Sequence, residues 1–378
     1  MDLFEQIPTP SLLFFIVYGI TGVVPFIAAL YLLLRRGNAF APDVTPPVRL
    51  RRWAAAFLIV SALCHVWWII FYIYSRDIHS LTYLVVVTLD YVGMVTTITG
   101  TMLSMLQDRR RPIWPAFVAM VPFMVLLVLH MLRPDDAFMD IAIAYNLVLY
   151  VLFFVYMVFA VRRYGRWLND NYADLENKKI WLSQAVSLAF VLLFVLYVLV
   201  DTNLNLIFLL HASELVFFGL LVWRVETLPQ LEESVQSQMH SPSEPENSNL
   251  TPLTSQPSPP IVNIDLAQIE RLLAEYCVAP QLFLQHDLTL QQLAQAVGTN
   301  RTYLSQYFSR QGITYNTYIN NLRINHFICR CGEATAAGQP IVARQLASES
   351  GYRSYSTFSL AFKQRTGQSV TAWIHDKE

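Results

Sequence analysis

Residues 293–308 read LAQAVGTNRTYLSQYF, and residues 346–362 read LASESGYRSYSTFSLAF. Each stretch begins with a short amphipathic helix that a glycine ends, Gly298 in the first and Gly351 in the second. A second helix follows each glycine, with large apolar residues repeating on one face. Helix, tight turn and helix is the helix-turn-helix pattern of DNA-binding domains. The repeat of this pattern predicts an all-α double helix-turn-helix domain over residues 263–378.

A helical stretch of about residues 315–333 lies between the two copies. A helix of about twenty residues spans about 30 Å, which is close to the roughly 34 Å of one turn of duplex DNA. The spacing therefore predicts that the two units enter successive major grooves on one face of the duplex.

About residues 285–373 resemble the DNA-binding domain of the AraC family of transcription activators. The resemblance rests on residues 288–294 (LTLQQLA), 303–305 (YLS) and 351–354 (GYRS), together with Gly298, Phe308, Arg323, Ile324, Phe358, Phe362, Lys363 and Gly367. It implies a double helix-turn-helix that binds DNA, commonly near promoters, and RNA polymerase as an expected partner.

Three positions depart from the family pattern. Phe327 stands where a small residue is common, and residues 329–331 read CRC where aliphatic residues are typical. Val370 replaces the usual proline three residues after Gly367. The first two departures predict altered packing of the linking helix, without changing the assignment.

Side chains on the outward face of each second helix are the candidates for DNA contact, because the apolar face packs into the domain. By their place in the family motif, the predicted base contacts are Arg301, Thr302, Ser305, Gln306, Tyr355, Ser356, Ser359 and Leu360. Arginine and glutamine can pair with guanine and adenine through two hydrogen bonds, whereas hydroxyls are less selective. The predicted phosphate contacts, which position without reading sequence, are Arg310, Arg353, Lys363 and Arg365. For each residue taken singly, the alternative is a solvated surface position.

The predicted domain is only weakly basic. Residues 263–378 hold ten Lys or Arg and eight Asp or Glu, whereas nucleic-acid-binding domains usually carry more positive charge. We therefore expect each monomer to bind DNA with modest affinity, and this affinity to fall steeply with salt. Dimerisation or the tether would then make DNA binding effective.

The first part of the chain has a different composition. The 378 residues are 54% hydrophobic and 14% charged, with a mean hydropathy of +0.39, and nearly all long apolar runs precede Val225. About 20 apolar residues cross a bilayer core of about 30 Å. Seven stretches reach that length, at about residues 11–34, 53–74, 81–106, 113–132, 137–161, 180–201 and 204–223. They predict a seven-helix transmembrane bundle over residues 1–225, and seven in succession disfavour a large soluble core.

Loop charge predicts the orientation of these spans, since cytoplasmic loops are enriched in Lys and Arg. The first, third and fifth loops carry thirteen basic residues: Arg35, Arg36, Arg49, Arg51, Arg52, Arg109, Arg110, Arg111, Arg162, Arg163, Arg166, Lys178 and Lys179. The alternate loops carry two, Arg76 and Arg133. We expect a multi-pass protein of the bacterial inner membrane, with its N-terminus outside and its DNA-binding domain in the cytoplasm.

Ionisable residues inside spans are costly in lipid and are therefore functional candidates. His65, Asp90 and Glu214 fall near the predicted midplane, and His211 shares a helix face with Glu214. They could form a polar pocket, a protonation switch or a metal site that senses an unknown ligand. The structural alternative is an interhelical hydrogen-bonded pair that only holds the bundle together.

Residues 226–262 are rich in proline, serine and glutamate and hold no lysine or arginine. Such a segment cannot bury a core, so it predicts a disordered acidic tether. Elsewhere, the absence of lysine before Lys178 excludes a retinal-type Schiff base, and no phosphate-binding glycine-rich loop is present. Four scattered cysteines predict neither a disulfide framework nor a zinc finger. No cofactor, metal ligand or catalytic residue is assigned.

Seven spans joined to such a DNA-binding domain also resemble the membrane-bound regulators of the AraC family found in some bacteria. The sequence predicts a one-component membrane sensor that binds promoter DNA, with a homodimer as an open possibility. The alternative is a membrane transporter or membrane enzyme with a regulatory DNA-binding adaptor, although the spans show no obvious transporter-type internal repeat.

Overall fold

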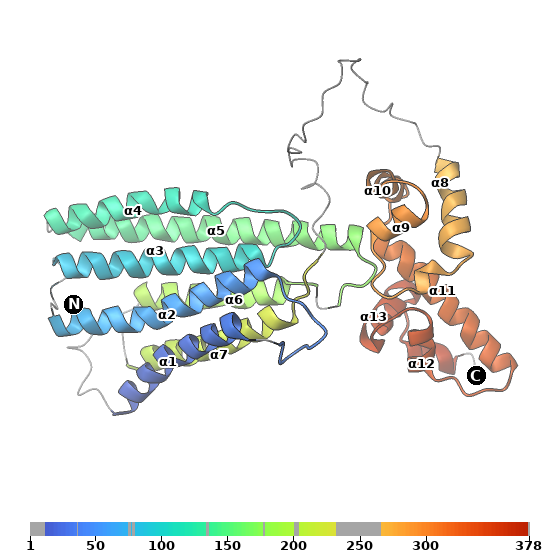
Figure 1. Cartoon of the computed structure of the whole chain (residues 1–378), viewed down its shortest axis with the longest axis horizontal. Helices are drawn as coiled ribbons and strands as arrows, with labels where there is room; N and C mark the ends of the chain where they lie inside the picture. The colour runs from blue at the N-terminus through green and yellow to red at the C-terminus, as the bar shows by residue number, and fades with distance from the viewer. Residues whose placement is uncertain are drawn as a thin grey trace, which may run out of the picture. The chain divides into compact units, whose positions relative to one another are not determined.

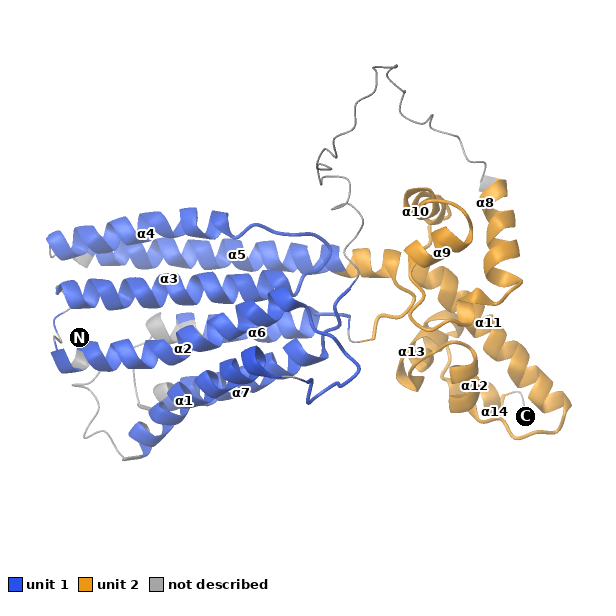
Figure 2. Cartoon of the chain, viewed as in Figure 1, with its two compact units in different colours: residues 1–164, 177–237 blue, residues 165–176, 238–378 orange. Residues whose placement is uncertain are grey.

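The computed structural model of the chain describes residues 12–35, 37–74, 77, 80–133, 136–176, 178–199, 204–231 and 266–376. Two compact units divide the chain (Figure 2): residues 1–164 with 177–237, and residues 165–176 with 238–378. Among the described residues the regular elements are helices, and one isolated antiparallel bridge joins Tyr172 to Thr289. The predicted all-α fold class is confirmed.

The first unit is a bundle of long helices lying side by side (Figure 1). The helices are α1 (Leu12–Leu34), α2 (Val48–Tyr74), α3 (Leu81–Ser104), α4 (Trp114–Leu132), α5 (Asp136–Asn171), α6 (Trp181–Leu199) and α7 (Leu204–Thr227). In this unit α1 packs against both α2 and α7, and α6 also packs on α7. The first two helices, α1 and α2, therefore pack together with the last helix of the bundle, α7.

Within the part of the chain that the structure describes, six helices are long and apolar enough to cross a membrane: Phe15–Leu34, Val48–Phe71, Leu81–Ser104, Trp114–Leu132, Ala137–Asn171 and Phe208–Thr227. In α6 the corresponding apolar stretch, Trp181–Leu193, is shorter among the described residues, so the seventh span stays a prediction. Large apolar side chains such as Ile27, Val121, Val151 and Phe159 face outward. Helices that satisfy their own backbone groups and expose apolar side chains suit a lipid environment.

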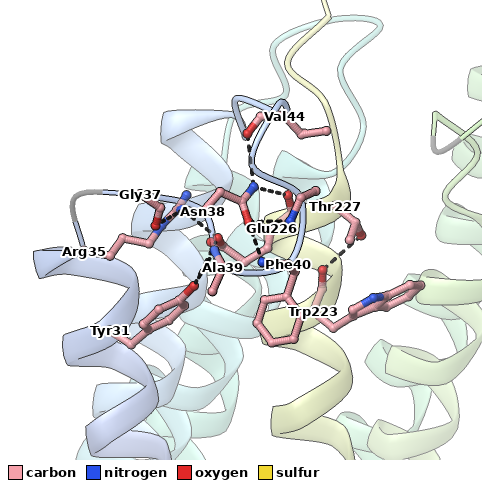
Figure 3. A network of polar contacts seen from close by, with 11 residues as sticks. Tyr31, Arg35, Gly37, Asn38, Ala39, Phe40, Val44, Trp223, Glu226 and Thr227 are labelled. Carbon is pink, nitrogen blue, oxygen red and sulfur yellow. Dashed lines mark hydrogen bonds and ion pairs between the residues drawn. The ribbon is translucent and has the colours of Figure 1, made fainter.

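A network of polar contacts connects the end of α7 to the end of α1 and the loop that follows it (Figure 3). The side chain of Glu226, near the end of α7, is fully buried and lies 2.6 Å from Nη1 of Arg35 at the end of α1. The side-chain amide of Asn38 donates to the backbone carbonyls of Glu226 (2.8 Å) and Val44 (3.1 Å). The end of α7 is thereby bonded to the loop between α1 and α2.

The chain stays packed a little beyond α7. Leu228 and Leu231 are buried, and the side chain of Gln107 bonds both the carbonyl of Pro229 (3.1 Å) and the amide of Leu231 (2.9 Å). The first residues of the predicted tether, 226–231, thus belong to the bundle. Its remainder, residues 232–262, lies outside the described residues.

The second unit contains short helices: α8 (Leu266–Leu273), the π-turn η2 (Ala274–Val278), the 3-10 turn η3 (Leu282–Leu284), α9 (Leu290–Ala296), α10 (Arg301–Arg310), α11 (Tyr315–Ala336), α12 (Ala343–Glu349), α13 (Tyr355–Thr366) and α14 (Val370–His375). Side chains cap the N-termini of the key helices, with Asn300 before α10, Thr314 before α11 and Ser354 before α13. Such caps satisfy amide groups that have no partner within the helix. The pairs α9–α10 and α12–α13 are the two predicted helix-turn-helix units, and α11 is the linking helix.

Two of the three departures from the family pattern, Phe327 and Val370, have packing explanations. Phe327 is fully buried against Phe358 and Phe362, with ring centroids 4.5 and 5.7 Å away, so it fills the core of the second helix-turn-helix unit. Val370 is the first residue of α14, directly after the capping Ser369. Proline is favoured at that position, and valine occupies it with its side chain buried.

A buried arginine joins the two helix-turn-helix units. Arg323 of α11 donates from Nε to the carbonyl of Phe283 and from Nη2 to that of Gln285, both at 2.7 Å. The ring of Tyr352 lies 5.5 Å from the guanidinium carbon. Burial lowers the pKa of the Arg323 guanidinium, although arginine stays charged at neutral pH. The buried charge is therefore stable only while these carbonyls surround it.

Gly351 packs closely against this junction, beside Leu284 and Arg323. Its φ is +88°, and a Cβ there would lie 2.7 Å from the carbonyl oxygen of Leu284 and 3.0 Å from Nε of Arg323. The Leu284 backbone lies between the two carbonyls that Arg323 binds, and Nε itself donates to one of them, so a shift of either group would disturb these hydrogen bonds. Glycine is thus required both by conformation and by space.

Substituting Gly351→Ala should destabilise the second unit by about 3 kcal/mol, since a left-handed alanine and an overpacked core each cost about 1–2 kcal/mol. Gly367→Ala is the matched control, because Gly367 has φ +77° but open space around it, and it should cost only the roughly 1–2 kcal/mol of a left-handed alanine. Hydrogen exchange of the α11–α13 amides in the full-length protein measures both. Equal effects would show that the close approach to Leu284 is unimportant.

Candidate functional site

The second helices of the two units present similar outward faces. In α10 the apolar side chains of Leu304, Tyr307 and Phe308 are buried, and in α13 those of Phe358 and Phe362 are. The opposite faces therefore point away from these apolar cores. Recognition helices of this type enter the major groove with their N-terminal residues foremost.

The structure places the predicted base contacts on these faces with different exposure. Thr302, Ser305, Gln306, Ser356 and Leu360 are exposed, and Arg301, Tyr355 and Ser359 are half-buried. The arrangement brings all eight residues onto two helices of one compact unit.

The predicted phosphate contacts differ in their surroundings. Arg310 and Lys363 are exposed at or near the ends of α10 and α13. Arg353 pairs with Asp287 at 3.0 Å, and Arg365 donates to the carbonyl of Asn321 and to Oδ1 of Asn325. The last two guanidinium groups therefore also hold parts of the domain together.

A further segment, Gly165–Glu176, belongs to the same unit although it precedes α6 in the chain. Ala173 is buried in the core of the first helix-turn-helix unit, and its amide donates to the carbonyl of Leu288 at 3.2 Å. The side chain of Asn316 in α11 donates to the carbonyls of Tyr172 (3.1 Å) and Ala173 (2.7 Å). Residues 172–176 are hereafter called the docking segment.

The docking segment reaches the first turn of both second helices. Tyr172 interacts electrostatically with Arg301, the first residue of α10, and burial lowers the pKa of that guanidinium. At α13, the hydroxyl of Thr357 donates to Oε2 of Glu176 at 3.5 Å. The segment thus contacts the helix ends that a duplex would meet first.

The sequence did not predict this segment. Residues 162–179 were interpreted only as a basic cytoplasmic loop. One signal was present: Asp170, Asp174 and Glu176 stand among arginines and lysines. Acidic residues in a basic loop are compatible with a basic partner. No local pattern in the sequence, however, predicts that they pack against residues 288–316.

The first unit brings three of the four intramembrane candidates together. Nδ1 of His211 lies 3.0 Å from Oε2 of Glu214, and the rings of His65 and His211 have centroids 5.9 Å apart. The hydroxyl of Thr21 lies 3.0 Å from Nε2 of His65 and 3.4 Å from Nδ1 of His211. Helices α1, α2 and α7 each contribute at least one of these polar groups.

Asp90 lies in a neighbouring set of contacts. Its Oδ1 accepts from Sγ of Cys64 at 2.6 Å, and its Oδ2 accepts from Nε1 of Trp68 at 3.3 Å. Thr21, Cys64 and Trp68 were not singled out in the sequence, because hydroxyl, thiol and indole groups are common within apolar spans.

A scan against protein-family models matches residues 293–375 to a family described as a helix-turn-helix domain. The C-terminal domain is an AraC-type helix-turn-helix domain. The match confirms the resemblance inferred from the repeated motif, and it indicates a regulator rather than an enzyme. Searches of the curated proteins and of the solved structures gave no match.

Lys363→Ala should weaken binding of the AraC-type domain to all duplex sequences alike and reduce the slope of log affinity against log salt by about 1, because the predicted phosphate contact is lost. Gln364→Ala is the matched control, an exposed neutral neighbour on the same helix. Fluorescence anisotropy at several salt concentrations measures both. An unchanged slope for Lys363→Ala would remove this residue from the interface.

Proposed function

We propose that the chain is a membrane-bound one-component transcription regulator. It senses a signal in or at the membrane and binds promoter DNA through both helix-turn-helix units. The observation that carries this proposal is that a segment linking two apolar helices, α5 and α6, is part of the compact unit that holds the AraC-type domain. The DNA-binding domain is thus connected to the apolar bundle by more than its N-terminal tether.

Binding of double-stranded DNA is supported by the geometry of the second unit. The buried Arg323 junction fixes α10 and α13 in one body, so both recognition helices approach a duplex together. The exposed hydroxyl and amide groups of Thr302, Ser305, Gln306 and Ser356 supply donors and acceptors for base edges. A homodimer and contact with RNA polymerase are parts of the same proposal.

Localisation in the bacterial inner membrane rests on loop charge and on the apolar helices. Arginine and lysine are concentrated in the first, third and fifth loops. The fifth loop follows the end of α5 and, along the chain, is on the same side of the spans as the DNA-binding domain. The N-terminus is accordingly outside, and the AraC-type domain reaches DNA from the cytoplasmic face.

The docking segment supplies a mechanism for regulation. A carboxylate at the N-terminus of a helix occupies the place that a DNA phosphate would take, since the amide groups there attract anions. The Glu176 carboxylate lies 3.5 Å from the hydroxyl of Thr357 in the first turn of α13, and Tyr172 interacts electrostatically with Arg301 at the start of α10. Docking and DNA binding therefore exclude each other, and the duplex competes with residues 172–176.

Signal transmission then needs no torque through the tether. Asn171 ends α5 and Trp181 begins α6, so a change in either helix alters the docking segment directly through the chain. A signal that favours release raises the fraction of domain free to bind DNA. The size of the effect is set by the difference in free energy between docked and released states.

Ala173→Glu should raise DNA affinity of the full-length protein, because a carboxylate cannot enter the apolar core where Ala173 is 2% exposed. The expected gain is about 5- to 150-fold, the usual range of coupling between two sites. The measurement is anisotropy with a mixed-sequence duplex at low salt, on protein in lipid nanodiscs.

Asn169→Glu is the matched control, since it adds the same charge to the same chain segment at a half-buried helical position outside the docking segment. It should leave affinity near that of the parent protein. Equal affinity for parent, Ala173→Glu and control would contradict competition. Lost DNA binding in Ala173→Glu alone would instead make the segment an essential part of the domain's fold.

A further inference from the structure

We propose that His65, His211 and Glu214 bind a divalent transition-metal ion of the zinc class within the bundle. One ligand atom from each residue lies within 4.8 Å of the others. Zinc bonds to imidazole nitrogen and carboxylate oxygen at about 2.0–2.2 Å, so these atoms need to move inward by less than about 1 Å each. Two imidazoles and one carboxylate form a donor set that suits zinc.

The hydrogen bonds of His65 prepare it for an ion. Nδ1 lies 2.8 Å from the carbonyl of Ser61, and because a carbonyl cannot donate, Nδ1 must carry the proton. The lone pair is then on Nε2, which faces Thr21 and the centre of the cluster. A ring N–H held by a backbone carbonyl is the usual second contact of metal-binding histidines, and it fixes the ring's orientation.

His211 and Glu214 are already adjacent. Their Nδ1 and Oε2 atoms are 3.0 Å apart, close to the roughly 3.3–3.6 Å that separates neighbouring ligands around tetrahedral zinc with bonds of this length. The i, i+3 spacing on α7 holds both side chains on one helix face. Binding of the ion displaces any proton shared between them to solvent, as metal binding to protonated ligands requires.

Charge also favours a cation. A carboxylate inside an apolar bundle is costly without a positive partner, and the spans carry no lysine before Lys178. Among the described residues, Glu214 is hydrogen-bonded to His211, whereas Asp90 is held by Cys64 and Trp68. A divalent ion neutralises Glu214 more fully than a neutral imidazole can.

The position of the cluster gives the ion a route. Thr21 is nine residues from the start of α1, His65 nine from the end of α2, and His211 seven from the start of α7. At 1.5 Å per residue these depths are about 10–14 Å from one end of the bundle. That end is the outer one in the proposed orientation, so the cluster lies nearer to ions outside the cell than to those in the cytoplasm. A three-residue ligand set leaves one position for water or for an exchangeable group.

As a signal, the ion deepens the proposed function and rests on it: metal bound between α2 and α7, beside Thr21 of α1, favours one arrangement of the bundle. Metal binding itself does not depend on DNA. The two claims can therefore fail separately.

The test uses full-length protein in nanodiscs, stripped with chelator, loaded with Zn²⁺ alone, desalted and analysed for zinc by mass spectrometry. The parent protein should hold about one zinc per chain. His65→Gln, His211→Gln and Glu214→Gln should each bind at least 10- to 100-fold more weakly, the range typical even for loss of a contact outside the coordination shell. Glu214→Gln keeps the size of the side chain and so separates ligation from folding.

His130→Gln is the matched control, since His130 is a buried histidine of α4 outside the cluster, and it should keep its zinc. A tetrahedral visible spectrum with Co²⁺ in the parent protein, absent from the three variants, gives a second readout. No zinc in the parent, or equal zinc in all variants, overturns the site. If zinc binds as expected but the protein does not bind DNA with or without the ion, the metal site stands and the proposed function is refuted.

Discussion

The fold of the DNA-binding half depends on one buried cation. Arg323 connects α11 to the loop of residues 282–286 through two 2.7 Å hydrogen bonds, and Gly351 passes too close for any side chain. Removing one partner of such a contact leaves a buried charge without compensation, which is far more costly than the net value of the contact. The relative position of α10 and α13, and hence any reading of successive grooves, follows from this junction.

The junction also explains why the docking segment lies where it does. Asp174 is buried and interacts electrostatically with Arg323, and its neighbour Ala173 packs beside Leu288 and Leu293. The positive charge of Arg323, which holds the two helix-turn-helix units together, thereby also attracts the acidic docking segment. The proposed regulation and the architecture involve the same residues, so variants of Arg323 would affect both, whereas variants of Ala173 would separate them.

The sequence predicted regular elements well because their causes are local. The glycine stops at Gly298 and Gly351, the apolar faces of α10 and α13, and the length of apolar runs each depend on neighbours within a few turns. Phe327 shows the limit: the sequence marked it as a departure, but only packing against Phe358 and Phe362 shows that it fills a core.

The candidate sites were predicted less completely. His211 and Glu214 are three residues apart, so their meeting followed from helix geometry, whereas the approach of His65 and Thr21 depends on how α1, α2 and α7 pack. Asp90 was grouped with Glu214 from depth alone, and its contacts are instead with Cys64 and Trp68. The docking segment is a non-local contact between residues more than a hundred positions apart, such as Tyr172 and Thr289, and carries no periodic signal.

The central claim is that this membrane-anchored chain occupies promoter DNA. Genome-wide mapping of DNA crosslinked to the full-length protein in its own cells tests it most directly. The account predicts a small set of enriched promoters that share a sequence with two half-sites about one helical turn apart. A profile without enriched promoters, under conditions that both do and do not supply zinc, would contradict it.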